Sequence, residues 1–218
     1  MVTPTMPDAA LGDVDRATVG DLAPVLERAV RLAPGTLVRL RFGDGRATAL
    51  VRLPFAVLVS RSVAAGPDRA LDVATAAADV LAWLDGGAAP APRDHDWRGG
   101  LPPATGWRRI ETVPDGELRP LVRQGAMALK DAAEREGVPG AQPRAEVADA
   151  LLDSVVLIAT DDSGSRAEVT LRMLSALTRM GFLRKDGHAH VDTSGRWVRV
   201  VGEYGTVHRE LPGGLGLL

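Results

Sequence analysis

Two segments of the sequence begin in the same way. One half opens with Gly-Asp-Leu-Ala-Pro-Val-Leu at residues 20–26, and the other opens with Gly-Glu-Leu-Arg-Pro-Leu-Val at 116–122. Each opening is followed by an alternating segment that predicts a strand of a β-hairpin, at 46–53 in the first half and at 166–173 in the second. Since an internal repeat constrains the whole architecture, the sequence favours two related lobes.

Composition is that of an ordinary globular protein. Of the 218 residues 45% are hydrophobic, 25% charged and only 4% aromatic, so the core is expected to consist of Leu, Val and Ala. No window approaches the roughly 18 apolar residues of a membrane-spanning helix, and residues 1–8 lack the features of a signal peptide. The absence of cysteine excludes disulfides, thiolate metal sites and a cysteine nucleophile. We therefore expect a cytoplasmic protein with no membrane contact.

The first half is expected to form a helix followed by strands. Asp21 is the expected N-cap of a helix that ends at residues 34–35. The segments 36–42 and 46–53 alternate around the turn signal Gly43-Asp44-Gly45 and predict a hairpin. Further strands are predicted at 57–63 and 71–73, and a helix capped by Thr75 is predicted to end near Leu84.

The second half contains one segment with conflicting signals. Helices are predicted at 117–136 and 144–152, and strands at 155–160, 188–191 and 197–201, with 204–211 extending the sheet. Between them, the capping-box spacing of Ser165 and Glu168 favours a helix, whereas the alternation from residue 166 favours a strand. The hairpin of the first half decides between the two, because 166–173 corresponds to its strand at 46–53. We therefore predict a strand as far as Thr170 and a helix from Leu171 to Met180.

We predict an α+β fold of two related lobes, each with helices on a small antiparallel sheet. The lobes cover residues 19–86 and 114–211 and are joined by a Pro/Gly-rich crossover at 87–113, while residues 1–18 are expected to be disordered and 212–218 mobile. The C-terminal lobe is partly winged-helix-like, although a strand stands where winged-helix proteins have a helix. An exposed edge strand in each lobe would favour a homodimer.

Several strings in the sequence resemble a known family. They are Leu-Pro-Phe-Ala-Val-Leu-Val-Ser-Arg at 53–61, Leu-Pro-Pro-Ala-Thr-Gly-Trp-Arg-Arg at 101–109, and the shorter strings at 170–172, 180–183 and 204–207. With them the chain resembles an uncharacterised family of actinobacterial proteins. The lack of Asn and the presence of only two Ile and two Lys agree with a GC-rich genome. The resemblance implies no activity, because that family has no assigned function.

Aromatic and basic residues of the crossover are the predicted ligand-binding residues. A cleft between the lobes would be lined by Trp97, Trp107, Arg108 and Arg109, with His95 close by, and would suit a small anionic ligand or a protein partner. The imidazole of His95 between Asp94 and Asp96 could perform acid–base work, but a solvated loop anchored by Trp97 is the favoured interpretation.

Two further groups of residues have both a functional and a structural interpretation. Arg39, Arg41, Arg46 and Arg52 could form an anion-binding face of the first hairpin, or they could be its solvated face, paired with acids. His188, His190 and Asp192 would share one face of a strand and could bind a metal ion with help from His208. The alternative for the histidines is an exposed strand that binds nothing. No cofactor is predicted.

No catalytic motif is present. The run Gly43-Asp44-Gly45 lacks the third glycine of a dinucleotide fingerprint, and the sequence has no phosphate-binding loop, nucleophile elbow or metalloprotease motif. Our hypothesis is a non-catalytic binding or protein-interaction protein that uses the inter-lobe cleft. A winged-helix-like DNA-binding regulator is the alternative, although residues 144–218 contain nine Lys/Arg and ten Asp/Glu. A histidine-based, metal-dependent hydrolase is the third hypothesis.

Overall fold

The chain folds into two units. The computed structural model describes residues 11, 14–66, 70–135 and 141–212, so the predictions for residues 1–10 and 213–218 concern segments outside the described residues. One unit contains residues 1–52 and 61–99, and the other contains residues 53–60 and 100–218. The division falls inside the predicted crossover, parts of which therefore belong to each unit. None of the described helices is both long enough and apolar enough to span a bilayer.

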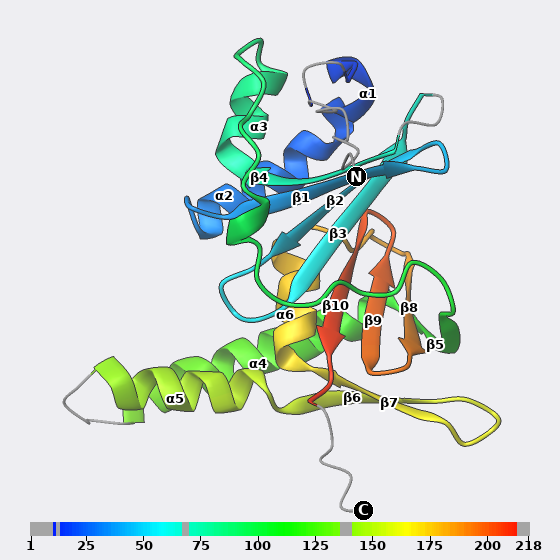
Figure 1. The fold of residues 1–218 in the computed structure, drawn as a ribbon. Coiled ribbons are helices and arrows are strands. Elements are labelled where there is room, and N and C mark those ends of the chain that lie inside the picture. The colour runs from blue at the N-terminus through cyan, green and yellow to red at the C-terminus, as the bar shows by residue number, and fades with distance from the viewer. Residues whose placement is uncertain (1–10, 12–13, 67–69, 136–140, 213–218) are drawn as a thin grey trace, which may run out of the picture. The chain divides into compact units, whose positions relative to one another are not determined.

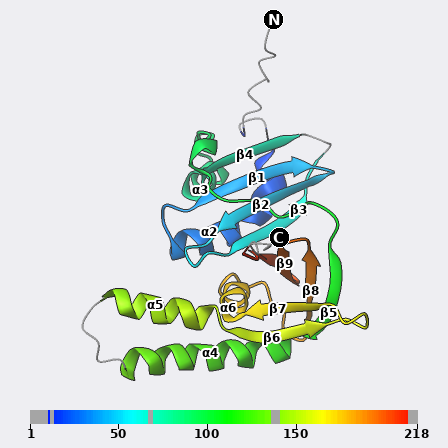
Figure 2. The same ribbon diagram turned by 60° about the horizontal axis from the view of Figure 1, so that its bottom comes forward.

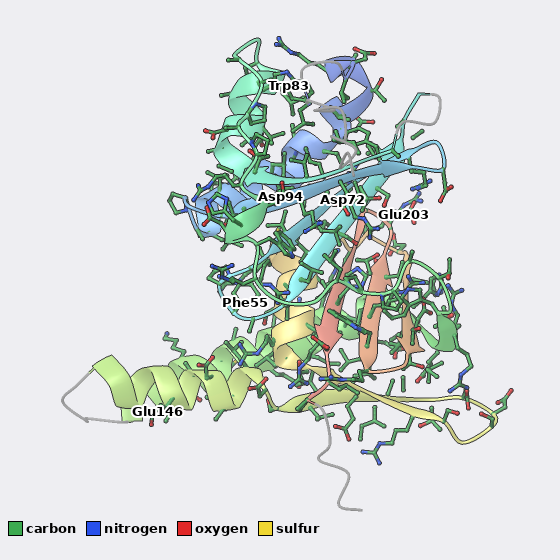
Figure 3. All side chains as sticks on the ribbon, in the orientation of Figure 1. Phe55, Asp72, Trp83, Asp94, Glu146 and Glu203 are labelled. Carbon is green, nitrogen blue, oxygen red and sulfur yellow. The ribbon has the colours of Figure 1, made fainter. Side chains whose placement is uncertain are left out.

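The first unit is built on an antiparallel sheet with strand order β4-β1-β2-β3 (Figure 1). Strand β1 buries every second residue, Val38, Leu40 and Phe42, as expected for a sheet with one covered face. Helices α2 and α3 pack against each other, and α3 buries Trp83 (Figure 3). The elements of this unit are α1 (Arg16–Val19), α2 (Ala23–Leu32), β1 (Leu37–Gly43), β2 (Arg46–Arg52), β3 (Leu58–Ala64), β4 (Leu71–Ala76) and α3 (Ala77–Leu84), with 3-10 turns at Gly20–Leu22 and Asp94–Asp96.

The predicted first hairpin is present, but the predicted helix caps are wrong. Asp44 and Gly45 connect β1 to β2 with positive φ angles of 52° and 66°, the backbone of a tight two-residue turn. Asp21 lies in a 3-10 turn, and the side chain that caps a helix is instead Asp15, which accepts from the amide of Ala17 at 3.1 Å. Thr75 belongs to β4, and its hydroxyl donates to another segment.

The second unit contains a sheet with strand order β3-β10-β9-β8-β5 and a separate β6–β7 hairpin. Residues 58–60 of β3 belong to this unit and pair with β10. Helices α4 and α5 lie side by side (Figure 2). The elements are β5 (Arg108–Pro114), α4 (Asp115–Arg135), α5 (Ala141–Leu152), β6 (Val155–Thr160), β7 (Arg166–Thr170), α6 (Leu171–Arg179), β8 (His188–Ser194), β9 (Trp197–Gly202) and β10 (Gly205–Glu210).

A buried arginine ties residues 53–60 to the helices of the second unit. Arg172 on α6 is 5% exposed, and its Nη1 donates at 2.7 Å to the carbonyl oxygen of Phe55. Figure 3 labels Phe55. Its Nε and Nη2 donate to the carboxylates of Asp153 at 3.0 Å and Asp149 at 3.2 Å. Because every side of the guanidinium has an acceptor, the charge is compensated where it is buried.

The predicted switch from strand to helix is confirmed, and β5 is the strand that the sequence does not reveal. Strand β7 ends at Thr170 and α6 begins at Leu171, as the alternation and the first hairpin together indicate. Strand β5 pairs with β8, but a register shift between Arg109 and Glu111 breaks its alternation. That irregularity removes the pattern by which an antiparallel strand is recognised.

Four strands and two helices of one unit have counterparts in the other, in a different order along the chain. In the first, α2 precedes the meander β1–β2–β3, and β4 pairs with β1 and leads directly into α3. In the second, α6 precedes β8–β9–β10, and β5 pairs with β8 and leads directly into α4. The packed helix pairs are α2 with α3 and α6 with α4. The topological counterpart of α2 is therefore α6, whereas the sequence repeat pairs α2 with α4.

We expect that adding a methyl group to Gly202 destabilises the second unit. A Cβ atom there would lie 2.5 Å from the carbonyl oxygen of Phe182, so backbone would have to move. We predict that Gly202→Ala lowers the free energy of unfolding by about 1–3 kcal/mol, measured by urea denaturation. Gly43→Ala is the matched control, because nothing lies within 4 Å of its Cβ position. Equal stabilities of the two variants would contradict this packing.

Candidate functional site

Trp107 packs against a polar cluster of the second unit. Its indole N–H donates to the carbonyl oxygen of Pro103 at 2.9 Å, which fixes the ring. The guanidinium carbon of Arg199 lies 4.2 Å from the centroid of the Trp107 ring. The His208 ring lies 5.8 Å from it, tilted by 56°. The cation and both rings thus stabilise one another.

The buried carboxylate of Asp192 holds the arginines of this cluster. Antiparallel pairing sets Asp192 opposite Arg199 on β9 and opposite Arg109 on β5. Its Oδ2 accepts from Arg199 at 2.9 Å and its Oδ1 accepts from Arg109 at 3.3 Å. Two guanidinium groups therefore compensate the desolvation of one carboxylate that is only 3% exposed.

The predicted metal site is not formed. Both oxygens of Asp192 face arginine, and Nδ1 of His190 lies 3.0 Å from the Thr112 hydroxyl. Burial and the charge of Arg109 lower the pKa of His190, and His188 is exposed. Among the described residues no three His, Asp or Glu side chains are arranged to hold a metal ion. The spacing of His188, His190 and Asp192 along β8 does not create a metal site, because arginines of the neighbouring strands bind the Asp192 carboxylate.

His208 is a neutral, buried side chain. Its Nε2 lies 2.9 Å from the hydroxyl of Ser60. Burial, with a further contribution from the charge of Arg199, lowers its pKa to about 3. An imidazole that does not take up a proton near pH 7 is unsuited to acid–base work there. It belongs to the structural cluster of Trp107, Arg199 and Asp192 through its contact with the Trp107 ring.

In the first unit, residues 91–98 form a segment that we call the strap. The hydroxyl of Thr75 donates to the carbonyl oxygen of Ala91 at 2.8 Å. The amide of Arg93 donates to the carbonyl oxygen of Ala74 at 2.6 Å, and the amide of Ala74 donates to Oδ1 of Asp94 at 2.9 Å. Figure 3 labels Asp94. The strap therefore occupies the edge of β4, which would otherwise be open to another strand.

The strap also explains the predicted Asp94-His95-Asp96 cluster. The carboxylate of Asp94 accepts a hydrogen bond from the backbone amide of Ala74 in β4. Asp96 accepts from Nε of Arg93 at 2.8 Å, and this hydrogen bond lowers the pKa of the Asp96 carboxyl. The His95 side chain is 79% exposed, and its Nε2 lies 3.4 Å from Oδ1 of Asp96. The favoured interpretation, a solvated loop, is the one that the contacts support.

The predicted ligand-binding residues fall into two groups. His95 and Trp97 belong to the first unit, and Trp107, Arg108 and Arg109 belong to the second. Arg108 pairs with Asp161, and Arg109 pairs with Asp192. A single site formed by both groups stays a prediction. Within the first unit, Trp97 lines a hollow of about 240 Å³ together with Arg52 and Arg98.

Arginines of the predicted anion-binding face of the first hairpin have partners within the first unit. Nε of Arg39 lies 2.6 Å from Oδ1 of Asp72, and Nε of Arg41 lies 3.3 Å from its Oδ2. Arg46 donates to the carbonyl oxygen of Ser62 at 3.4 Å. Asp72, on the neighbouring strand β4, thus serves two arginines. Arg52 is the member of this set that lines the hollow beside Trp97.

Strand β6 exposes apolar side chains. Val155 is 43% and Ile158 46% exposed. A register shift between Val155 and Leu157 places Val155 opposite Thr170 while Ile158 is opposite Glu168, so both exposed side chains lie on the same face of the hairpin. In the part of the chain that the structure describes, β7 is the only strand that pairs with β6. An apolar strand with an open edge is a candidate surface for protein binding.

Family models match both halves of the chain. Residues 6–101 match a domain of unknown function (DUF8010), and residues 102–214 match a second domain of unknown function (DUF8185). The second match covers more than half of the 218 residues. The chain belongs to the DUF8185 family. The two matches meet at residues 101 and 102, next to the division of the structure between Gly99 and Gly100. No curated protein matches the sequence.

Solved structures of bacterial sliding clamps resemble this member of the DUF8185 family. The DNA polymerase III subunit beta from Pseudomonas aeruginosa matches with a TM-score of 0.56 and 12% identity, over 92% of this chain and 64% of that one. The clamp from Bartonella birtlesii bound to griselimycin gives 0.54 and 13%, over 92% and 64%. The clamp from Caulobacter crescentus gives 0.54 and 12%, over 94% and 66%.

At such identities the similarity concerns the fold. The chain spans about 64% of the length of the first clamp. The interpretation of the C-terminal lobe as winged-helix-like is wrong, because the fold matches sliding clamps. The local reason is visible in the topology, since α6 is followed by three strands of a larger sheet and the β6–β7 hairpin separates it from α5.

The sequence did not point to the exposed surface of the DUF8185 half. Residues 155–160 read as an uninterrupted apolar strand, a pattern typical of a strand buried on both faces. The absence of any charged residue in this strand, next to a polar turn at 161–165, is the signal that could have identified an open edge. Asp72 and Asp192 were missed as ion-pair partners because their arginines lie on other strands.

We predict that the buried His208 makes stability depend on pH. Its pKa is about 3 in the folded chain, against an ordinary value of 6.5, so the unfolded chain takes up the proton first as the pH falls below about 6.5. From pH 7 to pH 5 this lowers the free energy of unfolding by about 2 kcal/mol. His208→Gln should lose this part of the pH dependence in urea denaturation, whereas His188→Gln should keep it. An unchanged dependence in His208→Gln would contradict the assignment.

Proposed function

We propose that the chain is a non-catalytic protein-interaction protein and that its partner at β6 is a second copy of itself. The observation that carries the proposal is the exposed apolar strand β6, with Val155 and Ile158 on one face of a two-stranded hairpin. Two strands alone are marginally stable in water, and a third strand with an apolar face adds stability. The similarity to sliding clamps supports a protein-interaction role.

The backbone of β6 supports pairing at its outer edge. The amide of Thr160 donates to Oε2 of Glu111 at 3.2 Å, away from β7. Since backbone groups of a strand alternate between its two edges, the amide of Ile158 points the same way as that of Thr160. An antiparallel pair of β6 strands centred on Ile158 would therefore exchange backbone hydrogen bonds at this residue.

The composition of β6 favours a second copy as the partner. Residues 155–160 contain no charged side chain, so two β6 strands meeting edge to edge would bring no like charges opposite each other. In the first unit the strap occupies the edge of β4, which leaves that edge unavailable. A symmetric pair of identical patches closes on itself and forms a dimer.

We predict that lysine at β6 dissociates the dimer. Lys on an edge strand blocks pairing because the ammonium group would have to be desolvated against the partner. Light scattering coupled to size-exclusion chromatography should give a dimer for the natural chain, with a dissociation constant in about the micromolar range because one strand pair buries little area. Ile158→Lys should be monomeric with an unchanged far-ultraviolet circular dichroism spectrum.

Met127→Lys is the matched control for this experiment. Met127 is an apolar residue of α4 that is 65% exposed, so its replacement adds the same charge outside β6. It should leave the dimer intact. A natural chain that stays monomeric at high concentration, or a dimer that survives Ile158→Lys, would contradict the proposal.

Nucleic-acid binding is a second candidate function, favoured by the DNA polymerase names of the similar structures. The charge of the chain weighs against it. Net charge is −2, and α4 contains four acidic and four basic residues. The buried arginine of α6, Arg172, is paired with Asp149 and Asp153. A protein that binds the DNA backbone needs an excess of positive charge on one face.

We therefore expect no binding to a short fluorescein-labelled DNA duplex. At physiological salt, fluorescence anisotropy should show no saturation below about 100 µM protein, which is the weak end of non-specific affinity. The same titration at low salt shows how much of any signal is electrostatic. Micromolar binding at physiological salt, falling steeply as salt rises, would favour the DNA-binding alternative.

A further inference from the structure

The carboxylate of Glu111 occupies one end of the outer edge of β6. The amide of Thr160 donates to Oε2 of Glu111 at 3.2 Å, whereas the amide of Asp161 donates across the hairpin to the carbonyl oxygen of Ser165 at 3.0 Å. Successive amides of a strand point to opposite edges. The carboxylate of Glu111 therefore lies where the backbone of a further strand would pair with Thr160.

A register shift in β5 directs Glu111 toward β6. Arg109 is opposite Asp192 on β8. Glu111 is opposite the preceding residue, Val191, which faces the other side of the sheet. In a regular strand Arg109 and Glu111 would share one face, so the shift turns Glu111 to the face of the buried Val191. Because β5 contacts β6, the turned side chain reaches the amide of Thr160.

An ion pair beside this contact holds β5 against the end of β6. Arg108 pairs with Asp161, the residue that follows Thr160. Oδ1 of Asp161 also accepts from the amide of Ser165 at 2.9 Å, which fixes the turn after β6 as well. The Glu111 carboxylate thus has a defined position at the end of β6 and is not a loosely placed surface charge.

From this geometry we propose that Glu111 is an autoinhibitory contact of the β6 edge. The inference rests on the dimer proposed at β6 and adds the residue that limits its affinity. In an antiparallel pair centred on Ile158, Thr160 of one copy lies opposite Val156 of the other. The Glu111 carboxylate and the carbonyl oxygen of Val156 then compete for the N–H group of Thr160. Pairing along the whole of β6 requires that Glu111 leave this group.

This competition weakens the dimer. A hydrogen bond to an ionised carboxylate is stronger than one between two amides, so replacing Glu111 by a backbone carbonyl oxygen gains little at Thr160. Without the carboxylate, water would bind the Thr160 amide in the monomer, and a new protein hydrogen bond would form in the dimer. A symmetric pair contains this contact twice. Loss of the Glu111 carboxylate should therefore strengthen the dimer at both ends of the strand pair.

The test compares dissociation constants of the full chain by sedimentation velocity. Glu111→Ala should lower the dissociation constant about tenfold for each of the two contacts, and so about a hundredfold in all. Glu111→Gln retains an acceptor oxygen but loses the charge, and it should give an intermediate value. Glu203→Ala is the matched control, because it removes an exposed carboxylate that lies 3.6 Å from Arg184. It should leave the dissociation constant unchanged.

The amide signal of Thr160 reports the contact itself. In the ¹⁵N-labelled full chain, diluted until it is monomeric, Glu111→Ala should move this signal upfield because the hydrogen bond to the carboxylate is lost. Glu203→Ala should leave the signal in place. The indole N–H of Trp107 donates to Pro103, and its signal should be the same in every variant, which shows that the second unit has folded.

Different results overturn this inference and the proposed function. A dissociation constant that Glu111→Ala leaves unchanged or raises, in a chain whose dimer Ile158→Lys abolishes, overturns the role of Glu111 but leaves the dimer at β6. If both the natural chain and Glu111→Ala stay monomeric at high concentration, the dimer is wrong, and the role of Glu111 with it. Glu111→Ala combined with Ile158→Lys should be monomeric. A dimer of this double variant would place the strengthened pairing outside β6 and overturn the inference.

Discussion

The hydrogen bonds between the strap and Ala74 are the interaction on which the first unit depends. The amide and carbonyl of Ala74 would otherwise form an open sheet edge, and the strap satisfies both through Asp94 and the Arg93 amide. The same attachment brings Trp97 within 5.9 Å of Arg39 and makes the hollow beside Arg98. Closing the edge of β4 and forming the hollow are therefore two results of one contact.

In the second unit, side-chain pairs connect some strands, and another strand exposes apolar side chains. Cross-strand pairs centred on the buried Asp192 connect β5, β8 and β9, and Trp107 packs against Arg199 of this cluster. Along β6, Glu111 of β5 accepts from the amide of Thr160, whereas the side chains of Val155 and Ile158 remain exposed. An uncharged apolar strand that is left exposed is suited to binding another strand there.

Local patterns in the sequence predicted the helices and strands better than they predicted which side chains of distant strands contact each other. The alternation before Thr170 and the helical spacing after Leu171 located a strand-to-helix switch that the structure confirms. Strand β5 escaped prediction because its register shift breaks alternation. Trp97 and Trp107 were predicted to lie beside arginines, but which arginine contacts each depends on pairing between distant strands. The exposure of Ile158 could not be predicted, because an apolar run ordinarily indicates burial.

Amide hydrogen exchange of Ile158, measured as a function of protein concentration, tests most directly whether β6 is the open edge. Strand pairing protects only the backbone groups that it engages. Protection of the Ile158 amide should therefore rise with concentration, whereas the Ala74 amide, bonded to Asp94, should be protected equally at every concentration. An Ile158 amide whose exchange does not depend on concentration, in a chain that nevertheless dimerises, would contradict pairing through β6.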